Sequence, residues 1–291
     1  MNKEIAASEL VLNPDGSVYH LHLRPEHIAR DIIIVGDQDR VKEVSKHFDR
    51  IEFQTSKREF VTHTGYIGNK RLTALSTGIG TDNIDIVFNE LDALVNIDLN
   101  TRIPKEDLQS LNIIRVGTSG ALQKDIPIDS ILLSSYGLGL DGLMNFYKHT
   151  PNETEVELLK QINEKVSLPI EPSLTSGSSE LINLFKDNNL QQGITLTSTG
   201  LYGPQGRVLR LQPQVDRFID DLAELNFDGL RITNLEMETS AIYGLGRLLG
   251  HHCLSVNAIL ANRQRLTFSK DSHAIVEEAI QLTLSKLTAT V

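Results

Sequence analysis

Residues 31–36 have the sequence DIIIVG, a short apolar run that ends at a glycine and leads into the polar stretch DQDRVKEVSKHF. A continuous apolar run of this length, bounded by a glycine, is typical of a strand buried on both faces of a sheet. The residues 39–48 that follow have the pattern of a helix. A buried strand that leads through a glycine into a helix predicts the repeating unit of an α/β protein.

Helical and strand patterns alternate from this strand to the C-terminus. Residues 59–78 alternate around Gly68–Asn69, which predicts a hairpin with its turn at that dipeptide. Further helices are predicted at 82–97, 152–166, 214–225 and 272–287, further strands at 111–117, 130–137, 193–199 and 252–262, and a strand that runs into a helix at 234–250. Asp82 is expected to cap the helix at 82–97, and the polar residues 98–110 predict a surface excursion. The pattern favours helices on both faces of a central, largely parallel or mixed sheet.

Composition and charge limit the function. The 291 residues are 40% hydrophobic and 23% charged, an ordinary globular balance that allows one large domain or two smaller ones. The net charge of −10 argues against a nucleic-acid partner, because non-specific binding to phosphates needs a basic face. The one cysteine, Cys253, excludes an internal disulfide and is expected to be buried in its apolar run. No stretch resembles a signal peptide or a membrane span, so we expect a cytoplasmic protein with no membrane partner.

Two stretches that resemble known motifs are set aside. GLGLDG at 137–142 matches the dinucleotide fingerprint, but the residues after it soon reach Pro151 instead of forming the helix that the fingerprint must open. The neighbours His251 and His252 point in opposite directions on a strand, so they are not expected to share a metal ion. No metal site is therefore predicted.

Two turns predicted at the ends of strands carry arginines. They are VGDQDRV at 35–41 and RVGTSGAL at 115–122, and their anion-attracting residues are Gly36, Arg40, Arg115, Thr118 and Ser119. Backbone amides at such turns attract anions, and an arginine adds a charge-assisted contact. Two such turns can converge at the carboxyl edge of the sheet, where α/β proteins bind ligands. Taken singly, each is equally well a tight turn with a surface arginine.

The stretch GLYGPQGR, residues 200–207, places Gln205 and Arg207 two positions apart on a backbone that contains proline and glycine. A glutamine amide offers both an acceptor and donors, whereas arginine offers only donors. Together they match a planar molecule with a donor between two acceptors, such as the O2, N3–H and O4 edge of uracil. The alternative is a surface turn with two solvated side chains.

The stretch NLEMETSA, residues 234–241, holds Glu236 and Glu238 among apolar residues. If the helix begins near Met237, the two carboxylates occupy its first turn, where the helix dipole favours them. They are then either ordinary residues of a helix start or a pair of acceptors for vicinal hydroxyls, such as those of a ribose.

Seven motifs in order resemble the nucleoside phosphorylases of the trimeric and hexameric class, and above all the uridine phosphorylases. They are VGDQDRV, SKREF, STGIG, RVGTSGAL, LYGPQGR, NLEMETSA and ANR. The resemblance runs from VYHLHL at residue 18 to the last helix. It implies a single α/β domain over residues 1–291, with a mixed central sheet flanked by helices. The implied activity is that of a pentosyltransferase, which converts uridine and phosphate reversibly to uracil and ribose 1-phosphate in pyrimidine salvage.

The resemblance also implies a role for each matched residue. Phosphate would be held by Gly36, Arg40, Arg115 and Thr118, and by Arg58 of a neighbouring subunit. The ribose would contact Glu236, Met237 and Glu238, and its 5′-hydroxyl would meet His20 of that subunit, with His22 as the alternative. The base would be bound by Gln205 and Arg207, and Arg263 would support Arg207. The smallest active unit would therefore be a homodimer, with a hexamer as the larger assembly.

Three of these residues would act in catalysis, namely Gln205, Arg207 and Arg115. Bond cleavage leaves negative charge on the uracil ring, where a well-placed donor typically contributes about 3 kcal/mol. Inorganic phosphate is the co-substrate that attacks the anomeric carbon, so no other cofactor and no enzyme nucleophile are implied. Family members can hold a monovalent cation between subunits; Glu59 and Ile79 match that site, whereas GIGTDN departs from the usual GIGGPS.

Departures from the family pattern keep alternatives open. Leu201 stands where an aromatic residue usually packs on the base. The rivals within the superfamily are the purine phosphorylases, which place an aspartate near Asn262 and Arg263, and the nucleosidases, which lack the phosphate arginines. A nucleoside-binding protein without activity is the alternative from another class.

Overall fold

The computed structural model describes residues 3–186 and 190–289. Its helices are α1 (Arg40–Ser45), α2 (Thr81–Asn96), α3 (Glu153–Lys165), α4 (Ser179–Phe185), α5 (Phe218–Glu224), α6 (Thr239–Leu249) and α7 (Ser272–Thr288), with 3-10 turns η1 (Pro25–His27), η2 (Leu143–Phe146) and η3 (Gly203–Gln205). Its strands are β1 (Asp31–Val35), β2 (Arg50–Lys57), β3 (Phe60–Ile67), β4 (Lys70–Ser76), β5 (Ile97–Asp98), β6 (Ile103–Pro104), β7 (Asn112–Ala121), β8 (Ile131–Leu140), β9 (Ser173–Ser176), β10 (Gln191–Ser198), β11 (Asn226–Phe227), β12 (Leu230–Glu236), β13 (His252–Asn262) and β14 (Thr267–Phe268).

The main sheet is mixed, as the sequence predicts. Its strand order is β11-β12-β10-β8-β13-β7-β1-β4-β3-β2, with β9 paired to β8 and β14 paired to β13. Strand β1 runs parallel to both neighbours, and Ile33 lies beside Ala74 of β4 and Ile114 of β7. Every residue of β1 is buried. The apolar run DIIIV is therefore a central strand covered on both faces.

The sheet also closes on itself, which the sequence patterns do not indicate. Strand β12 pairs antiparallel with β7, placing Leu235 opposite Gly120 and Asn234 opposite Ala121. Through this pairing β7, β13, β8, β10 and β12 form a closed ring of strands. The closure brings the end of β12, where Glu236 lies, next to residues near the end of β7.

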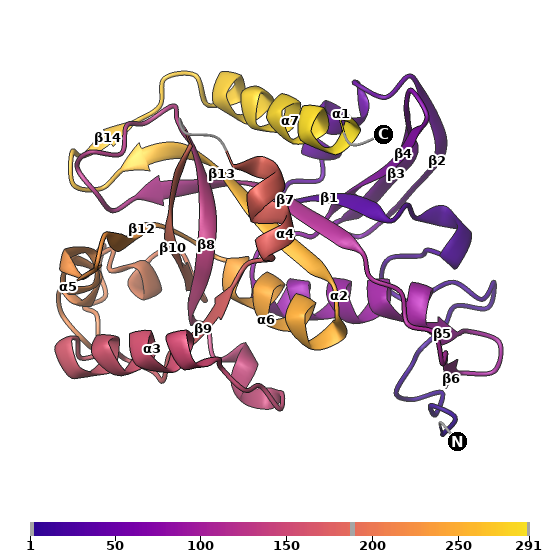
Figure 1. The fold of residues 1–291 in the computed structure, drawn as a ribbon, viewed down its shortest axis with the longest axis horizontal. Helices are drawn as coiled ribbons and strands as arrows, with labels where there is room; N and C mark the ends of the chain where they lie inside the picture. Colours follow the sequence, from indigo (N-terminus) through magenta and orange to yellow (C-terminus); the bar gives the residue numbers. More distant parts are fainter. Residues whose placement is uncertain (1–2, 187–189, 290–291) are drawn as a thin grey trace.

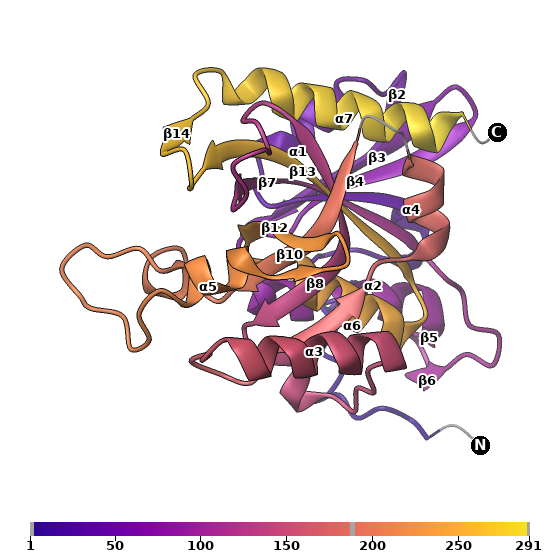
Figure 2. The same cartoon turned by 60° about the vertical axis from the view of Figure 1, so that its left-hand side comes forward.

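Helices cover the sheet on both sides (Figure 1). Side chains of α1, α4 and α7 share one buried apolar cluster with strands such as β1 and β7, and those of α2 and α6 share a second. A third cluster lies under α3 and α5. Figure 2 shows the segment that precedes α5 projecting from the body of the molecule. Among the described residues, no helix is both long enough and apolar enough to cross a membrane.

The stretch GLGLDG does not form a nucleotide-binding turn, and its first glycine serves helix packing instead. Its first four residues belong to β8, and α6 packs directly against them. A Cβ at Gly137 would lie 2.9 Å from the backbone nitrogen of Ser240, so only glycine lets this helix approach so closely. The dinucleotide fingerprint is thus a packing feature here.

Several predicted boundaries are wrong by a few residues. Helix α1 ends at Ser45 and α5 begins only at Phe218. The N-cap of α2 is Gly80, so Asp82 lies in the first turn instead of capping it. The excursion at 98–110 includes most of a short β5–β6 hairpin, whose Arg102 side chain donates to the Leu10 carbonyl of the N-terminal segment.

Candidate active site

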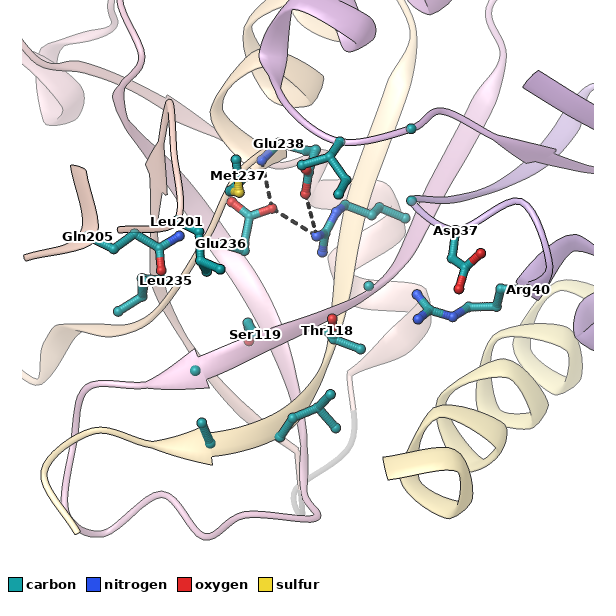
Figure 3. Close-up of a pocket in the computed structure, with 18 of the residues that line it drawn as sticks. Asp37, Arg40, Thr118, Ser119, Leu201, Gln205, Leu235, Glu236, Met237 and Glu238 are labelled. Atoms are coloured by element: carbon teal, nitrogen blue, oxygen red, sulfur yellow. Dashed lines mark hydrogen bonds and ion pairs between the residues drawn. The ribbon is translucent and has the colours of Figure 1, made fainter. Parts of the chain in front are cut away.

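A pocket of about 800 Å³ lies where β1, β4, β7 and β12 reach their carboxyl ends. Nine of the residues to which the resemblance assigns a role in binding substrate line it: Gly36, Arg40, Arg115, Thr118, Gln205, Arg207, Glu236, Met237 and Glu238. Figure 3 shows Arg40 at one end, Gln205 at the other, and Glu236 and Glu238 between them. VGDQDRV forms the turn from β1 into α1 as predicted, whereas RVGTSGAL is not a turn, because β7 continues through it to Ala121. The two motifs nevertheless meet in one pocket.

Arg115 is the centre of a buried ion cluster. Its Nη2 lies 2.7 Å from Oε2 of Glu238 and 3.1 Å from Oε2 of Glu236. Burial opposes the charge on Arg115, but the two carboxylates outweigh it and hold the pKa of the guanidinium above its ordinary value. Burial also raises the pKa of Glu236, while Arg115 acts in the opposite direction. One guanidinium thus faces two carboxylates, so each of the three charges depends on the other two.

Gly117 makes this position of Arg115 sterically feasible. The guanidinium folds back over Gly117, and a Cβ there would lie only 1.9 Å from Nη1 of Arg115. The same Nη1 donates to Oδ1 of Asn257 at 3.2 Å. Gly117 therefore leaves room for the Arg115 side chain to lie over the backbone of its own strand.

Glu236 caps a helix, and this corrects the expectation that both carboxylates occupy the first turn of α6. The helix begins at Thr239, Glu238 is its N-cap residue, and Glu236 is the last residue of β12. The Glu236 carboxylate accepts from the backbone nitrogens of Glu238 and Thr239 and from the Thr197 hydroxyl, at 2.7–3.1 Å. With Arg115 as a further partner, its acceptor capacity is largely used inside the protein.

Glu238 retains more capacity for a ligand. Its Oε1 accepts from the backbone nitrogen of Gly80 at 2.9 Å, and its Oε2 accepts from Arg115 at 2.7 Å. Each carboxylate oxygen can accept two hydrogen bonds, so each can also accept from a hydroxyl in the pocket. The Gly80 contact ties this side chain to the segment between β4 and α2.

Arg40 supplies a second positive charge to the pocket. It is the first residue of α1, after the turn that follows β1. Burial lowers the pKa of its guanidinium, Arg115 adds to this shift by like-charge repulsion, and Asp37 opposes it. An arginine keeps its proton in proteins. Two guanidiniums that repel each other across a pocket therefore favour an anion between them.

Gln205 and Arg207 contact each other at the opposite end of the pocket. Nη1 of Arg207 donates to Oε1 of Gln205 and, at 2.6 Å, to the carbonyl of Leu201. Gln205 is 2% exposed, so it is not one of the two solvated side chains of a surface turn. Gln205 ends the turn η3 and Arg207 follows two residues later, so one loop presents both groups to the pocket.

Arg263, which is expected to support Arg207, contacts the backbone of the loop that carries Arg207. Its Nη1 donates to the backbone carbonyl of Gln205. Burial lowers the pKa of Arg263, and the positive charge of Arg207 lowers it further. The two guanidiniums repel each other, so Arg263 supports the loop through the peptide backbone.

His20, His22 and Arg58 do not line this chain's own pocket. Nδ1 of His20 lies 2.6 Å from the Glu90 carboxylate of α2, whereas His22 pairs with Asp15 at 3.2 Å. Arg58 is exposed at the tip of the β2–β3 hairpin, with φ of 56°. Their expected contacts with substrate in a neighbouring subunit stay a prediction.

Sequence reasoning missed several residues that line the pocket. Leu235, Gly120, Leu260, Ala261 and Phe268 form an apolar part of the wall. Strand β14, which carries Phe268, has two residues and leaves no periodic signal.

Cys253 is buried as predicted, and burial raises the pKa of its thiol. No group of histidine, cysteine and acidic side chains in the described part of the chain is arranged to hold a metal ion.

Comparison with known proteins identifies the family. The model of the phosphorylase superfamily matches residues 30–291. A uridine phosphorylase of Thermococcus kodakarensis is 27% identical over 290 residues, covering 97% of this chain and 92% of the relative. A purine nucleoside phosphorylase of the DeoD type from Bacillus cytotoxicus is 24% identical, covering 90% of this chain and 98% of the relative.

A solved structure agrees with these relatives over nearly the whole fold. The nucleoside phosphorylase of Trypanosoma brucei, described as showing uridine phosphorylase activity, superposes with a TM-score of 0.88 at 26% identity. The match covers 96% of this chain and 99% of that one. The resemblance of the seven motifs to nucleoside phosphorylases is thereby confirmed, and the chain belongs to the phosphorylase superfamily.

Proposed function

We propose that this protein is a uridine phosphorylase, which cleaves uridine with phosphate to give uracil and ribose 1-phosphate. The observation that carries the proposal is the order of groups along one pocket. Arg40 stands at one end, Glu238 in the middle, and Gln205 at the other end, where Arg207 is hydrogen-bonded to it. These groups match, in the same order, a phosphate, a ribose and a base with a donor between two acceptors.

The chemistry follows from this order. A phosphate oxygen attacks the anomeric carbon, the bond from that carbon to N1 of the base breaks, and the electron pair leaves on the uracil ring. The ring charge spreads toward O2 and O4, where Arg207 and the Gln205 amide can donate. Donors fixed in advance at these oxygens stabilise the transition state more than the ground state. The departing anion then takes up a proton from solvent.

Glu238 positions the ribose in this proposal, and Glu236 positions Glu238. Glu238 has acceptor capacity for the 2′- and 3′-hydroxyls beside its bonds to Gly80 and Arg115. Glu236 accepts from the backbone nitrogen of Glu238 at 3.0 Å and so holds its backbone in place. Met237, which also lines the pocket, lies between them in the chain.

A second copy of the chain completes the site. Arg58 would bring a third guanidinium to the phosphate, and His20 would donate to the ribose 5′-hydroxyl. Glu90 accepts from the backbone nitrogens of His20 and Leu21 and contacts Nδ1 of His20, which fixes the direction of the imidazole ring. The proposal thus includes a homodimer as the minimal active unit. The proposal also includes a cytoplasmic location, which the single cysteine supports, since it fits a reducing compartment.

Asn262 favours a pyrimidine over a purine substrate. Purine phosphorylases of the superfamily use an aspartate near this position to protonate the base. Here the Asn262 amide is 1% exposed and donates to the carbonyls of Gln123 and Ile126, while its oxygen accepts from the backbone nitrogen of Arg265. An amide with these partners anchors a turn and supplies no acid.

The test is a phosphate-dependent assay of uracil release. Purified protein is incubated with uridine or inosine, with and without phosphate, and the sugar product is identified. We expect release of uracil only with phosphate, with ribose 1-phosphate as product and little reaction with inosine. Equal rates without phosphate and free ribose as product would instead identify a nucleosidase. Faster cleavage of inosine would identify a purine enzyme.

A further inference from the structure

One row of residues crosses four strands along the apolar wall of the pocket. Strand pairing places Leu235 of β12 opposite Gly120 of β7, Gly120 opposite Ala261 of β13, and Ala261 opposite Phe268 of β14. Residues directly opposite each other on paired strands face the same side of the sheet. All four line the pocket.

The row has large residues at its ends and small ones in the middle. Three strand spacings of about 4.8 Å each make it about 14 Å long. The middle of the row, formed by Gly120 and Ala261, is nearly bare backbone and is called the floor below. Even a Cβ on Gly120 would lie 3.8 Å from the Cβ of Ala261, an ordinary contact. A flat ring resting on the floor would be bounded by Leu235 on one side and Phe268 on the other.

The backbone around Phe268 is held firmly although its side chain is exposed. Asn262 pairs with Thr267, Ala261 pairs with Phe268, and the backbone nitrogen of Ser269 donates to the Leu260 carbonyl at 2.7 Å. The buried amide of Asn262 anchors the intervening turn through the backbone nitrogen of Arg265. The phenyl ring, in contrast, is part of a residue that is 65% exposed. A solvent-accessible ring on a rigid backbone is suited to meet a ligand.

No other aromatic side chain is among the described residues that line this pocket. Leu201, at the position where related enzymes carry an aromatic residue, also lines it and is 46% exposed. A leucine offers apolar contact but no π-face. The two-residue strand β14 therefore supplies what the loop at 200–207 lacks.

We propose that Phe268 is the aromatic wall of the base-binding site and determines the preference for a planar, unsaturated ring. This inference rests on the proposed function, because it takes the Gln205 end of the pocket as the base site. Gln205 and Arg207 would read the polar edge of the base, and Phe268 would contact its ring. Offset or edge-to-face ring contacts strengthen with aromatic character of the partner.

The experiment compares uracil with 5,6-dihydrouracil, which keeps O2, N3–H and O4 but has a saturated, non-planar ring. Binding of each is measured by calorimetry in saturating phosphate for the wild type, Phe268→Leu and Leu266→Ala. Leu266 is the matched control, because it is 91% exposed on the same hairpin and does not line the pocket. Kinetic constants for uridine and for phosphate are measured alongside.

We expect the wild type to prefer uracil to dihydrouracil. Phe268→Leu should weaken uracil binding about tenfold and bring the two affinities close together, since loss of a base–aromatic stacking contact typically weakens binding by about fivefold to a hundredfold. KM for uridine should rise while KM for phosphate stays unchanged. Leu266→Ala should match the wild type in every measurement.

The outcomes separate this inference from the proposed function. An active enzyme in which Phe268→Leu keeps the wild-type preference for uracil would overturn the role of Phe268 alone. A wild type that neither binds uracil nor cleaves uridine would overturn the proposed function. Melting temperatures of the variants check the fold, and the exposed ring at position 268 leaves little reason for a loss of stability.

Discussion

The guanidinium of Arg115 and the carboxylate of Glu238 are paired at 2.7 Å in a buried site, although they belong to different halves of the proposed reaction. Arg115 is expected to bind phosphate and Glu238 to bind ribose. In the proposed reaction, phosphate would therefore compete with Glu238 for Arg115. The pair would couple the two substrates, because phosphate that draws on Arg115 leaves Glu238 Oε2 with one more acceptor position for the ribose hydroxyls.

The first prediction tests this competition. Glu238→Gln removes one negative charge beside Arg115, so phosphate should bind several-fold more tightly in calorimetry without nucleoside. The same variant should lose about 100-fold in kcat/KM for uridine, because an amide is a weaker acceptor for the ribose hydroxyls. Unchanged phosphate affinity would show that the pair does not oppose phosphate binding.

The second prediction concerns the close approach at Gly117. Gly117→Ala places a methyl group where Arg115 Nη1 lies, so the guanidinium must move and phosphate binding should fall by tenfold or more. Gly120→Ala is the control, since its Cβ would make only ordinary contact at 3.8 Å. We expect Gly120→Ala to keep phosphate affinity while raising KM for uridine. Equal phosphate affinities in both variants would contradict this account.

The third prediction separates base binding from catalysis at the 200–207 loop. If Arg207 stabilises the departing uracil anion, Arg207→Ala should lower kcat as well as raise KM, with a loss on the order of 100-fold in kcat/KM. Gln205→Ala should blur selectivity between uridine and other nucleosides. The measurement is kcat at saturating uridine and phosphate. A wild-type kcat in Arg207→Ala would mean that the loop only recognises the base.

The fourth prediction tests a site shared between two chains. Arg58→Ala and Glu238→Ala should each be nearly inactive alone. In mixed oligomers some sites combine a wild-type Arg58 from one chain with a wild-type Glu238 from the other, so activity should partly return. Mass spectrometry verifies that mixed oligomers have formed, and their complete inactivity would place Arg58 outside the site.

The fifth prediction concerns stability. Glu155 of α3 is buried and accepts from Arg247 at 2.6 and 2.8 Å, and from the backbone nitrogens of Asn152 and Ser176. Burial acts to raise the pKa of Glu155, but these hydrogen bonds outweigh it and hold the pKa below its ordinary value. Glu155→Ala should therefore lower the free energy of unfolding by about 3 kcal/mol at neutral pH.

The pH dependence of this effect has a definite sign. A carboxyl whose pKa is lower in the folded state stabilises the protein above its unfolded pKa of about 4.3, and this contribution is lost as the pH falls through the folded pKa. The difference between wild type and Glu155→Ala should therefore shrink in acid. Glu164→Ala, an exposed change on the same helix, should have little effect at any pH. If the difference in free energy of unfolding between wild type and Glu155→Ala did not change with pH, the destabilisation would come from lost packing instead of lost charge interactions.

The sequence by itself determined the order of the long strands and helices, the family and most of the residues around the pocket, but not the shorter elements β9, α4, β11 and β14. The run DIIIV predicted a buried strand because its apolar character is a local property of consecutive residues. The motifs around Arg40, Arg115 and Gln205 carried enough specific residues to indicate a nucleoside phosphorylase, and the comparisons confirmed the family. Local patterns encode such features because turns and amphipathic faces depend on neighbours in the chain.

The tertiary structure alone decided how those residues are connected. Glu236 caps α6, Arg263 bonds the carbonyl of Gln205, and β12 closes the ring with β7. Phe268 joins the wall only because β14 pairs with Ala261 at the end of a four-strand row. Each of these groups could have paired with several other groups of the same chemical type elsewhere in the chain. Which partner is chosen depends on long-range packing and on the burial that makes one hydrogen bond more favourable than another, and no local pattern records that choice.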